Sequence, residues 1–193
     1  MSRPREFDID VALNSAMQVF WAKGFELTSL DELCDAMGLG RSSLYAAFGD
    51  KYALYLRALD RYEEASALRL NEELTRPVPV REAIAAFVNR IIDDIVSGPG
   101  RRGCFIGNCA AALARHDRDT AARVRRSLGR IEAAFRDALG RAKARRELAP
   151  KTDIVALARF LTAGIQGLRL LGKVNPDRAA LDDIASVMLR CLR

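Results

Sequence analysis

Hydrogen-bond donors gather in the stretch GLGRSSLYAAFGDK, which covers residues 38–51. Apart from the single acidic residue, Asp50, its charged and hydroxyl-bearing side chains can all donate to anionic or carbonyl oxygens: Arg41, Ser42, Ser43, Tyr45 and Lys51. Leu44 and Phe48 lie four residues apart, so a short helix of about residues 41–48 would bury both. The remaining face, with Arg41, Ser42 and Tyr45, would then point outward with side chains short enough to enter a DNA major groove.

Two preceding helices are predicted to hold this short helix in place. Apolar residues at helical spacing mark a first helix with Ile9, Leu13, Ala16 and Phe20, which stops at Lys23-Gly24. Thr28 and Asp31 have the spacing of a capping box, so they predict the start of a second helix. Gly38 ends it, because a tight turn needs the positive φ that glycine tolerates. Three short helices joined in this way describe a helix-turn-helix.

The rest of the chain also shows helical periodicity, with the prolines placed between the periodic segments. Asp50 is expected to cap a long helix that reaches about Leu74. Further helices are predicted at roughly 79–97, 104–115, 117–147, 153–172 and 178–191. No segment alternates with a period of two residues, so the fold class is predicted to be all-α.

The distribution of charge limits how this chain could bind nucleic acid. The formal net charge is +6, but residues 1–52 hold five basic and eight acidic side chains and carry −3. The remainder therefore carries +9. If the N-terminal part binds DNA, a few placed cations must do so, because that part has no general basic field.

Several function classes are not supported by the sequence. His116 is the only histidine and has no paired nucleophile, and no glycine-rich phosphate loop is present, so we expect no enzyme activity and no cofactor. The four cysteines lack metal-ligand spacing, so no metal site is expected. The N-terminus lacks an apolar signal segment, and Arg159, Gln166 and Arg169 interrupt the most apolar stretch. We therefore expect a cytoplasmic protein with reduced thiols and no membrane span.

The run TSLDELCDAMGLGRSSLYAAFGDKYALYL, residues 28–56, resembles the signature of the TetR (tetracycline-repressor-like) family of bacterial transcription regulators. The shared elements are Thr28 before the second helix, Gly38 at its end, the Leu44-Tyr45 pair, and Phe48 followed by Lys51. Three positions depart from the family pattern: Gly40 stands where serine is common, Ala47 where histidine or tyrosine is frequent, and Tyr52 where glutamate is frequent.

The resemblance implies a helix-turn-helix DNA-binding domain in residues 1–52, followed by a larger helical ligand-binding and dimerisation domain in residues 53–193. It also implies a homodimer that binds a palindromic double-stranded DNA operator as a repressor and is released by a small-molecule inducer. Phosphate contacts would come from Thr28, Tyr45 and Lys51. Base edges would be read by Arg41, Ser42 and Ser43. Arg3 and Arg5 could reach a minor groove, but a loose tail is the simpler interpretation.

The C-terminal domain yields candidates for a ligand pocket, each of which could equally be plain core. They are Phe87, Ile91, Cys104, Phe105, Asn108, Phe160 and Gln166. A helical seam is predicted to pair with the twin subunit, with an intrachain core as the open alternative: Leu157, Leu161, Gly164, Ile165 and Leu168.

Cys104 raises an alternative mode of regulation. It follows Arg101 and Arg102 at a predicted helix N-terminus, and these features favour a reactive thiolate. Some relatives in the resembled family use a cysteine at a similar Gly-Cys junction to sense electrophiles or oxidants. The competing interpretation is that Cys104 and Cys109 are small buried residues, as free cysteines usually are. A helical scaffold without DNA binding is a further alternative, but it would leave the exposed Arg-Ser-Ser-x-Tyr face unexplained.

Overall fold

The computed structural model describes residues 7–112 and 116–192, and within these ranges all regular structure is helical. The elements in chain order are α1 (Ile9–Leu27), α2 (Leu30–Met37), α3 (Arg41–Phe48), α4 (Lys51–Leu74), α5 (Val80–Ser97), the 3-10 helix η1 (Pro99–Arg102), α6 (Phe105–Ala112), α7 (Arg118–Ala144), α8 (Ile154–Val174) and α9 (Arg178–Arg190). The all-α prediction is confirmed, and most predicted ends lie within three residues of the observed ones. Arg3, Arg5 and Arg115 lie outside the described residues.

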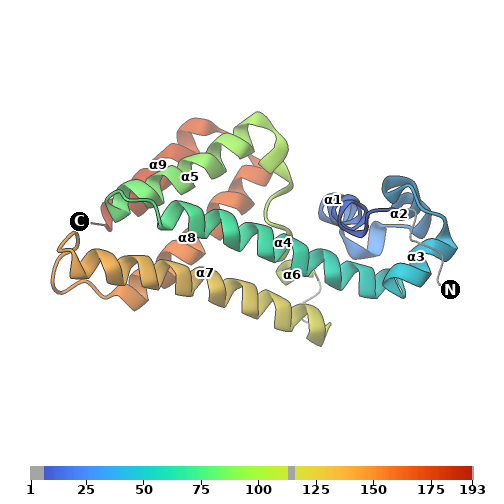
Figure 1. The fold of residues 1–193 in the computed structure, drawn as a ribbon. Coiled ribbons are helices and arrows are strands. Elements are labelled where there is room, and N and C mark those ends of the chain that lie inside the picture. The colour runs from blue at the N-terminus through green and yellow to red at the C-terminus, as the bar shows by residue number, and fades with distance from the viewer. Residues whose placement is uncertain (1–6, 113–115, 193) are drawn as a thin grey trace.

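The helices form two groups that α4 connects. Figure 1 shows α1, α2 and α3 at one end of the molecule and α5, α8 and α9 at the other. The long helix α4 runs from the first group to the second with α7 beside it, while α6 lies near the middle. A displacement along α4 would therefore reach both groups.

The start of α2 differs from the prediction by one residue. Ser29, not Thr28, is the N-cap: its hydroxyl accepts from the Glu32 backbone N–H at 3.1 Å, and the Glu32 carboxylate accepts from the Ser29 N–H at 2.9 Å. The predicted Thr28–Asp31 capping box is wrong because Thr28 turns inward and is only 2% exposed. Its hydroxyl donates to the Gly24 carbonyl at 2.6 Å.

Gly24 interrupts α1 at the predicted place. Its φ of 80° and ψ of 170° are non-helical, and a final short turn continues to Leu27. A positive φ of this kind is strained for a residue with a Cβ, so glycine fits the position. The backbone between Lys23 and Phe25 is therefore a break that separates the body of α1 from the segment leading to α2.

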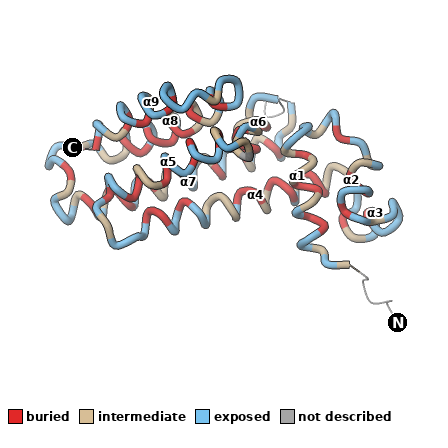
Figure 2. The backbone as a smooth tube through the Cα atoms, turned by 90° about the horizontal axis from the view of Figure 1, so that it is seen from above, coloured by how far each residue is buried: buried red, intermediate tan, exposed pale blue. Residues whose placement is uncertain are grey.

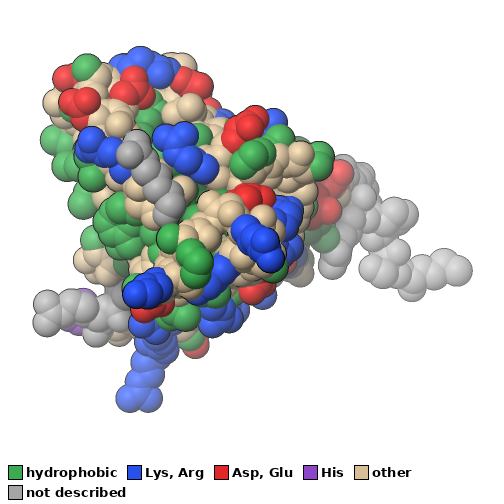
Figure 3. Space-filling view, turned by 90° about the vertical axis from the view of Figure 1, so that its left-hand side faces the viewer, with side chains coloured by type: hydrophobic (Ala, Val, Ile, Leu, Met, Phe, Trp, Pro, Cys, Tyr) green, Lys and Arg blue, Asp and Glu red, His purple; other side chains and the backbone are tan. Residues whose placement is uncertain are grey.

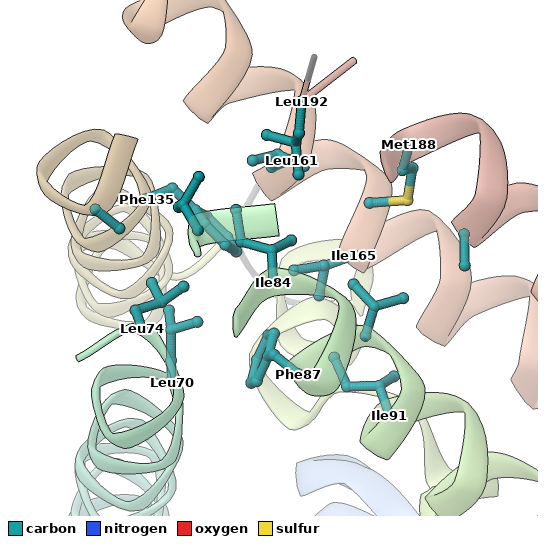
Figure 4. Packing of buried hydrophobic residues seen from close by; sticks show 14 of the residues in the cluster. Leu70, Leu74, Ile84, Phe87, Ile91, Phe135, Leu161, Ile165, Met188 and Leu192 are labelled. Atoms are coloured by element: carbon teal, nitrogen blue, oxygen red, sulfur yellow. The ribbon is translucent and has the colours of Figure 1, made fainter. Parts of the chain in front are cut away.

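Two hydrophobic cores are present, and they meet along α4. The first joins α1–α3 to the first half of α4, through Leu54, Tyr55 and Tyr62, and to α6 and the start of α7. The second begins at Leu70 and includes α5, α8, α9 and the C-terminal half of α7. Figure 4 shows part of this second core, with side chains from several helices pointing toward one another. The domain boundary at residue 52 stays a prediction, but the packing of the first core continues as far as Tyr62.

The arginine-rich helix α7 is attached to α4 by several ion pairs. Arg126 pairs with both Asp60 and Glu63 of α4, at 2.6 and 2.9 Å. Arg123 and Arg130 add one further pair each, to Asp60 at 3.1 Å and to Glu63 at 3.2 Å. The Glu63 side chain is 3% exposed, so this carboxylate is buried and held between arginines. This cluster attaches α7 to α4 midway between the two groups of helices.

The helix α8 has the length and apolar composition of a membrane span, which is weak evidence for a single helix. In the structure its Leu161, Ile165 and Leu168 are fully buried in the second core. The apolar composition of α8 is therefore explained on this side by packing within the chain.

Candidate functional site

The turn between α2 and α3 is fixed by backbone geometry and two buried anchors. Gly38 adopts the left-handed conformation with φ of 64°, and the Leu39 N–H donates to the Cys34 carbonyl at 2.9 Å. Leu44 is fully buried and Phe48 is 4% exposed, as predicted. Because these two side chains fix one face of α3, the opposite face of the helix must point away from the core.

That opposite face carries the residues that the sequence singles out. Arg41, Ser42 and Ser43 are exposed, and Tyr45 is 45% exposed. Figure 2 shows that most of α3 is exposed at the N-terminal end of the molecule. The structure therefore brings four of the six predicted DNA contacts together on a single protruding helix. Gly40 gives α3 no side-chain cap, as the sequence indicates.

Arg41 is engaged by an acidic neighbour on α2. Its guanidinium donates to Asp31 through Nε at 3.0 Å and through Nη2 at 2.7 and 2.8 Å. This hydrogen bonding raises the pKa of Arg41 above its usual value. Both side chains are more than half exposed, so DNA could compete for the guanidinium. Base reading by Arg41 would require at least part of this pairing to open.

Lys23 is neutralised in a similar way, because its ammonium pairs with Glu32 across the junction of α1 and α2. The hydrogen bond from Lys23, followed by that from the Ser29 backbone, lowers the pKa of Glu32 to about 2. The pair is exposed, so it orients α2 rather than adding much to the free energy of unfolding.

Lys51 differs from both of these cations. Its Nζ lies 4.4 Å from the centroid of the Phe25 ring, and it forms no ion pair with another described residue. It is the first residue of α4, where Asp50 accepts from the Ala53 N–H at 2.7 Å. A lysine at a helix N-terminus adds its charge to the partial positive charge of the free backbone N–H groups, which favours a phosphate.

Thr28 does not offer a free hydroxyl hydrogen in this arrangement. The side chain is buried and its hydrogen is donated to Gly24, so a phosphate contact from Thr28 requires that bond to break. Arg57 is a basic residue near this surface that sequence reasoning missed. It donates to the Ala47 carbonyl at 3.2 Å and lies 4.7 Å from the Phe48 ring centroid, so it supports the end of α3. A basic residue two turns into the helix after α3 is the signal that could have identified it.

A cavity of about 570 Å³ lies between the end of α1, α6 and α8. Four of the predicted pocket residues line it: Cys104, Phe105, Asn108 and Gln166. The sequence did not indicate that α1 contributes Phe20, Trp21 and Phe25, because no periodic pattern relates residues so far apart in the chain.

The other three pocket candidates lie elsewhere. Phe87 packs edge-on against Phe135 in the second core, with ring centroids 6.5 Å apart (Figure 4). Ile91 lines a smaller neighbouring cavity of about 280 Å³. Phe160 is 43% exposed on the surface of α8. An apolar residue at helical spacing can face a core, a cavity or a partner, and the spacing alone does not distinguish these environments.

The two neighbouring cysteines have different surroundings. Cys104 directly precedes α6 and is 6% exposed, while the Cys109 Sγ accepts from the Tyr55 hydroxyl at 3.1 Å. Burial raises the pKa of Cys109 to about 11, so this thiol is protonated at neutral pH. Of the two cysteines that line the cavity, Cys104 is therefore the one to test for reactivity.

The predicted dimer seam faces the chain's own core. Leu157, Leu161, Ile165 and Leu168 are buried, and a Cβ on Gly164 would lie 2.6 Å from Met188 of α9. The intrachain core, which the sequence left open as an alternative, is what the structure shows for this seam. The apolar face that α8 and α9 leave exposed is a different one: Phe160, Leu170, Leu171, Val174 and Val187.

Positive charge is not gathered into one patch at the far end of the molecule. Figure 3 shows that end, where Lys and Arg side chains are interspersed with acidic and hydrophobic ones. The excess of basic residues beyond residue 52 therefore does not make this end a second obvious nucleic-acid surface.

Comparison with known families gives two matches that together span most of the chain. Residues 12–58 match the model described as bacterial regulatory proteins, tetR family. Residues 79–188 match the model described as tetracyclin repressor-like, C-terminal domain. The first match includes α2, the turn and α3, and the second includes α5 through most of α9.

Individual relatives agree with these matches. YezE of Bacillus subtilis (strain 168), an uncharacterized HTH-type transcriptional regulator, is 35% identical over the full length of both chains. The HTH-type transcriptional repressor ComR of Escherichia coli (strain K12) is 33% identical over 97% of this chain and 90% of its own. A similar solved structure is a cysteine mutant of the TetR family transcriptional regulator CifR complexed with 26-base-pair operator DNA. It has a TM-score of 0.89 and 31% identity over the whole of both chains.

Proposed function

The chain belongs to the TetR family of transcriptional regulators, and from this premise we propose that it is a homodimeric repressor that releases its operator when a small molecule binds. The observation that carries the proposal is the exposed face of α3, with Arg41, Ser42, Ser43 and Tyr45, beside Lys51, which pairs with no carboxylate of the described residues. Ser43 and Tyr45 lie within one turn of Arg41, so a single insertion into a major groove would engage all of them.

The names of relatives support the direction of regulation. ComR is a repressor, and CifR is described in complex with double-strand operator DNA. A repressor of this kind blocks transcription by occupying DNA, so its regulation requires a state in which affinity for the operator falls. The cavity between α1, α6 and α8 is the proposed site of the small molecule, because it touches both groups of helices.

Operator binding is the direct test. Fluorescence anisotropy with a labelled fragment of DNA from upstream of the protein's own gene should show specific, salt-sensitive binding. We expect Arg41→Ala to relax the choice of base at one position of each half-site, since an arginine bidentate to guanine discriminates by about 1–3 kcal/mol. Wild-type protein that binds this fragment no better than a scrambled duplex would refute the proposal for this operator and favour a helical scaffold.

The exposed apolar face of α8 and α9 is the proposed dimer interface. Phe160, Leu171 and Val174 lie on one side of α8, and Val187 of α9 is 49% exposed. Packing this face against its symmetry mate would bury it and set the two α3 helices about one DNA turn apart, ~34–36 Å. We expect Phe160→Glu to be monomeric by size-exclusion chromatography with light scattering, whereas Arg159→Glu, its exposed neighbour, should remain dimeric. A dimeric Phe160→Glu variant would rule out this interface.

A second candidate is regulation through Cys104, favoured by its position on the wall of the cavity. An electrophile that enters the cavity can reach this thiol on its wall, whereas burial raises the pKa of Cys109 to about 11 and disfavours its thiolate. Iodoacetamide treatment of the native protein, followed by peptide mass spectrometry, tests the idea. Alkylation at Cys104 with loss of operator binding would support it, and an unreactive Cys104 would end it.

A further inference from the structure

The cavity that faces α1 has walls suited to a flat or chain-like apolar molecule. Phe20, Trp21, Phe25 and Tyr55 contribute aromatic surface, and Phe105 adds more from α6. Three small residues of α6 also line the cavity: Ala110, Ala111 and Ala112. A volume of about 570 Å³ falls in the range of sites that enclose small organic ligands.

The charges around the cavity have one sign. Its described lining includes Lys23, Arg169 and Lys173 and contains no carboxylate. Lys23 is neutralised by Glu32, and Asp94 lines the smaller neighbouring cavity together with Arg169. Within the described part of the chain, however, neither Arg169 nor Lys173 has a carboxylate oxygen within ion-pair distance. Lys173 instead donates to the Asn108 side-chain oxygen at 3.2 Å. An anionic ligand would supply the negative charge that this lining lacks.

A buried donor also lacks a partner. The Gln166 Nε2 is inaccessible to solvent and has no hydrogen-bond partner among the described residues. Its amide oxygen lies toward α6, 3.1 Å from where a Cβ on Gly107 would be. An unsatisfied buried N–H group is unfavourable, and because Gln166 lines the cavity, rotation of its side chain would let a ligand oxygen accept from this group.

We propose that this cavity binds a small apolar carboxylic acid, with its hydrocarbon part among the aromatic side chains and its carboxylate toward Gln166, Arg169 and Lys173. The inference rests on the proposed function and specifies it, since the acid would be the molecule that releases DNA.

The contact between the cavity and the DNA-binding surface runs through Phe25. This residue lines the cavity, and its ring also holds the Lys51 ammonium at 4.4 Å. Gly24, where the helical conformation of α1 is broken, directly precedes it, so a ligand that pushes on Phe25 can move the ring at this break. Movement of that ring displaces Lys51, the cation proposed to contact phosphate.

Trp21 provides a direct measure of binding. It is the only tryptophan in the chain, and it lines the cavity with its indole N–H donated to the Gly103 carbonyl at 3.2 Å. Titration of the full-length protein with hydrocinnamate and with its neutral amide should change the Trp21 fluorescence. We expect the acid to bind at least about tenfold more tightly, because a hydrogen bond to a charged group is stronger than one to a neutral group. Octanoate and octanamide form a second pair with a chain instead of a ring.

Two variants test the proposed contacts. Gln166→Leu removes the unpaired donor, and Lys173→Gln removes one cation while keeping a donor for Asn108. Each should reduce the preference for acid over amide by several-fold, up to about tenfold, and circular dichroism should confirm that both variants fold. A folded variant that keeps the wild-type preference would exclude that residue from the acid site. Lys151→Gln, at the far end of the molecule, makes the same change of charge and should behave as wild type.

The outcomes separate this inference from the proposed function. If neither acid binds more tightly than its amide, the acid site is refuted, even where the protein binds its operator normally. If an acid binds at Trp21 but leaves operator affinity unchanged, its role as the releasing molecule is refuted. Failure of the unliganded protein to bind operator would instead refute the proposed repressor function. The preference for acid over amide would still be measured by Trp21 fluorescence.

Discussion

Replacing Lys51 by alanine should weaken binding to every DNA sequence and reduce its dependence on salt. Lys51 forms no ion pair with another described residue, so its full charge is available to a phosphate, and a homodimer carries two copies. Each phosphate neutralised by a protein cation contributes about 0.9 to the slope of log affinity against log salt. The variant should therefore show a slope smaller in magnitude by about 1.8.

The measurement is fluorescence anisotropy of labelled operator and of a scrambled duplex at several salt concentrations. Between about 50 and 200 mM salt, wild type should lose about tenfold more affinity than Lys51→Ala. Lys51→Arg should keep the wild-type slope, because it keeps the charge, and Lys151→Ala controls for the change in net charge. An unchanged slope in Lys51→Ala would show that this lysine contacts no phosphate. It would refute the inference that a lysine without a carboxylate partner among the described residues is available to DNA.

Three further predictions concern the scaffold that holds this surface. Replacing both Arg126 and Arg130 by methionine leaves the buried Glu63 carboxylate without its partners and should lower the free energy of unfolding by about 3 kcal/mol. Glu63→Met leaves two arginines that can turn to water, so it should lower the same free energy by less than about 1 kcal/mol. Urea denaturation at fixed protein concentration would measure both losses, and equal losses would contradict this asymmetry. Phe135→Ala should lower the free energy of unfolding by about 3–5 kcal/mol, since this ring is fully buried against Phe87. A loss below about 1 kcal/mol would mean that the second core repacks to fill the space left by the ring. The pKa of Asp117 is lowered because hydrogen bonds from Thr120, Tyr52 and backbone N–H groups outweigh the effect of its burial. The stability that Asp117 contributes is therefore present above the usual aspartate pKa and is lost as the pH falls through the folded-state pKa. Tyr52→Phe should shift that loss to higher pH in an acid titration followed by circular dichroism, and an unshifted midpoint would argue against the Tyr52–Asp117 hydrogen bond.

The sequence predicts local structure well at positions where a single physical requirement selects a single type of residue. Gly38 and Gly24 occur where the backbone needs a positive φ, and Leu44 and Phe48 share a face because of helical spacing. The α2 cap was misplaced by one residue because Thr28 and Ser29 are both good caps. Only the burial of Thr28 in three dimensions decides between them.

Long-range relations were the least predictable. Phe160 and Leu161 are adjacent and both apolar, yet one is 43% exposed and the other fully buried. Helical spacing defines the stripes on α8 but not which neighbouring helix meets each stripe. The ion pairs of Arg41 and Arg126 depend in the same way on the crossing of helices, so neither partner could be named from the sequence.

The way α4 is shared between the two cores has a consequence for engineering regulators with new input–output combinations. Joining the DNA-reading part of one family member to the sensing part of another at residue 52 would divide the first core, which extends to Tyr62. A junction between Tyr62 and Leu70 keeps each core intact along α4. Phe105 and Ile106 of α6 pack in the first core, so a working hybrid must also match that surface to its new N-terminal partner. Interchangeable parts in such a chain are therefore defined by shared packing, and a cut at the start of a helix does not separate them.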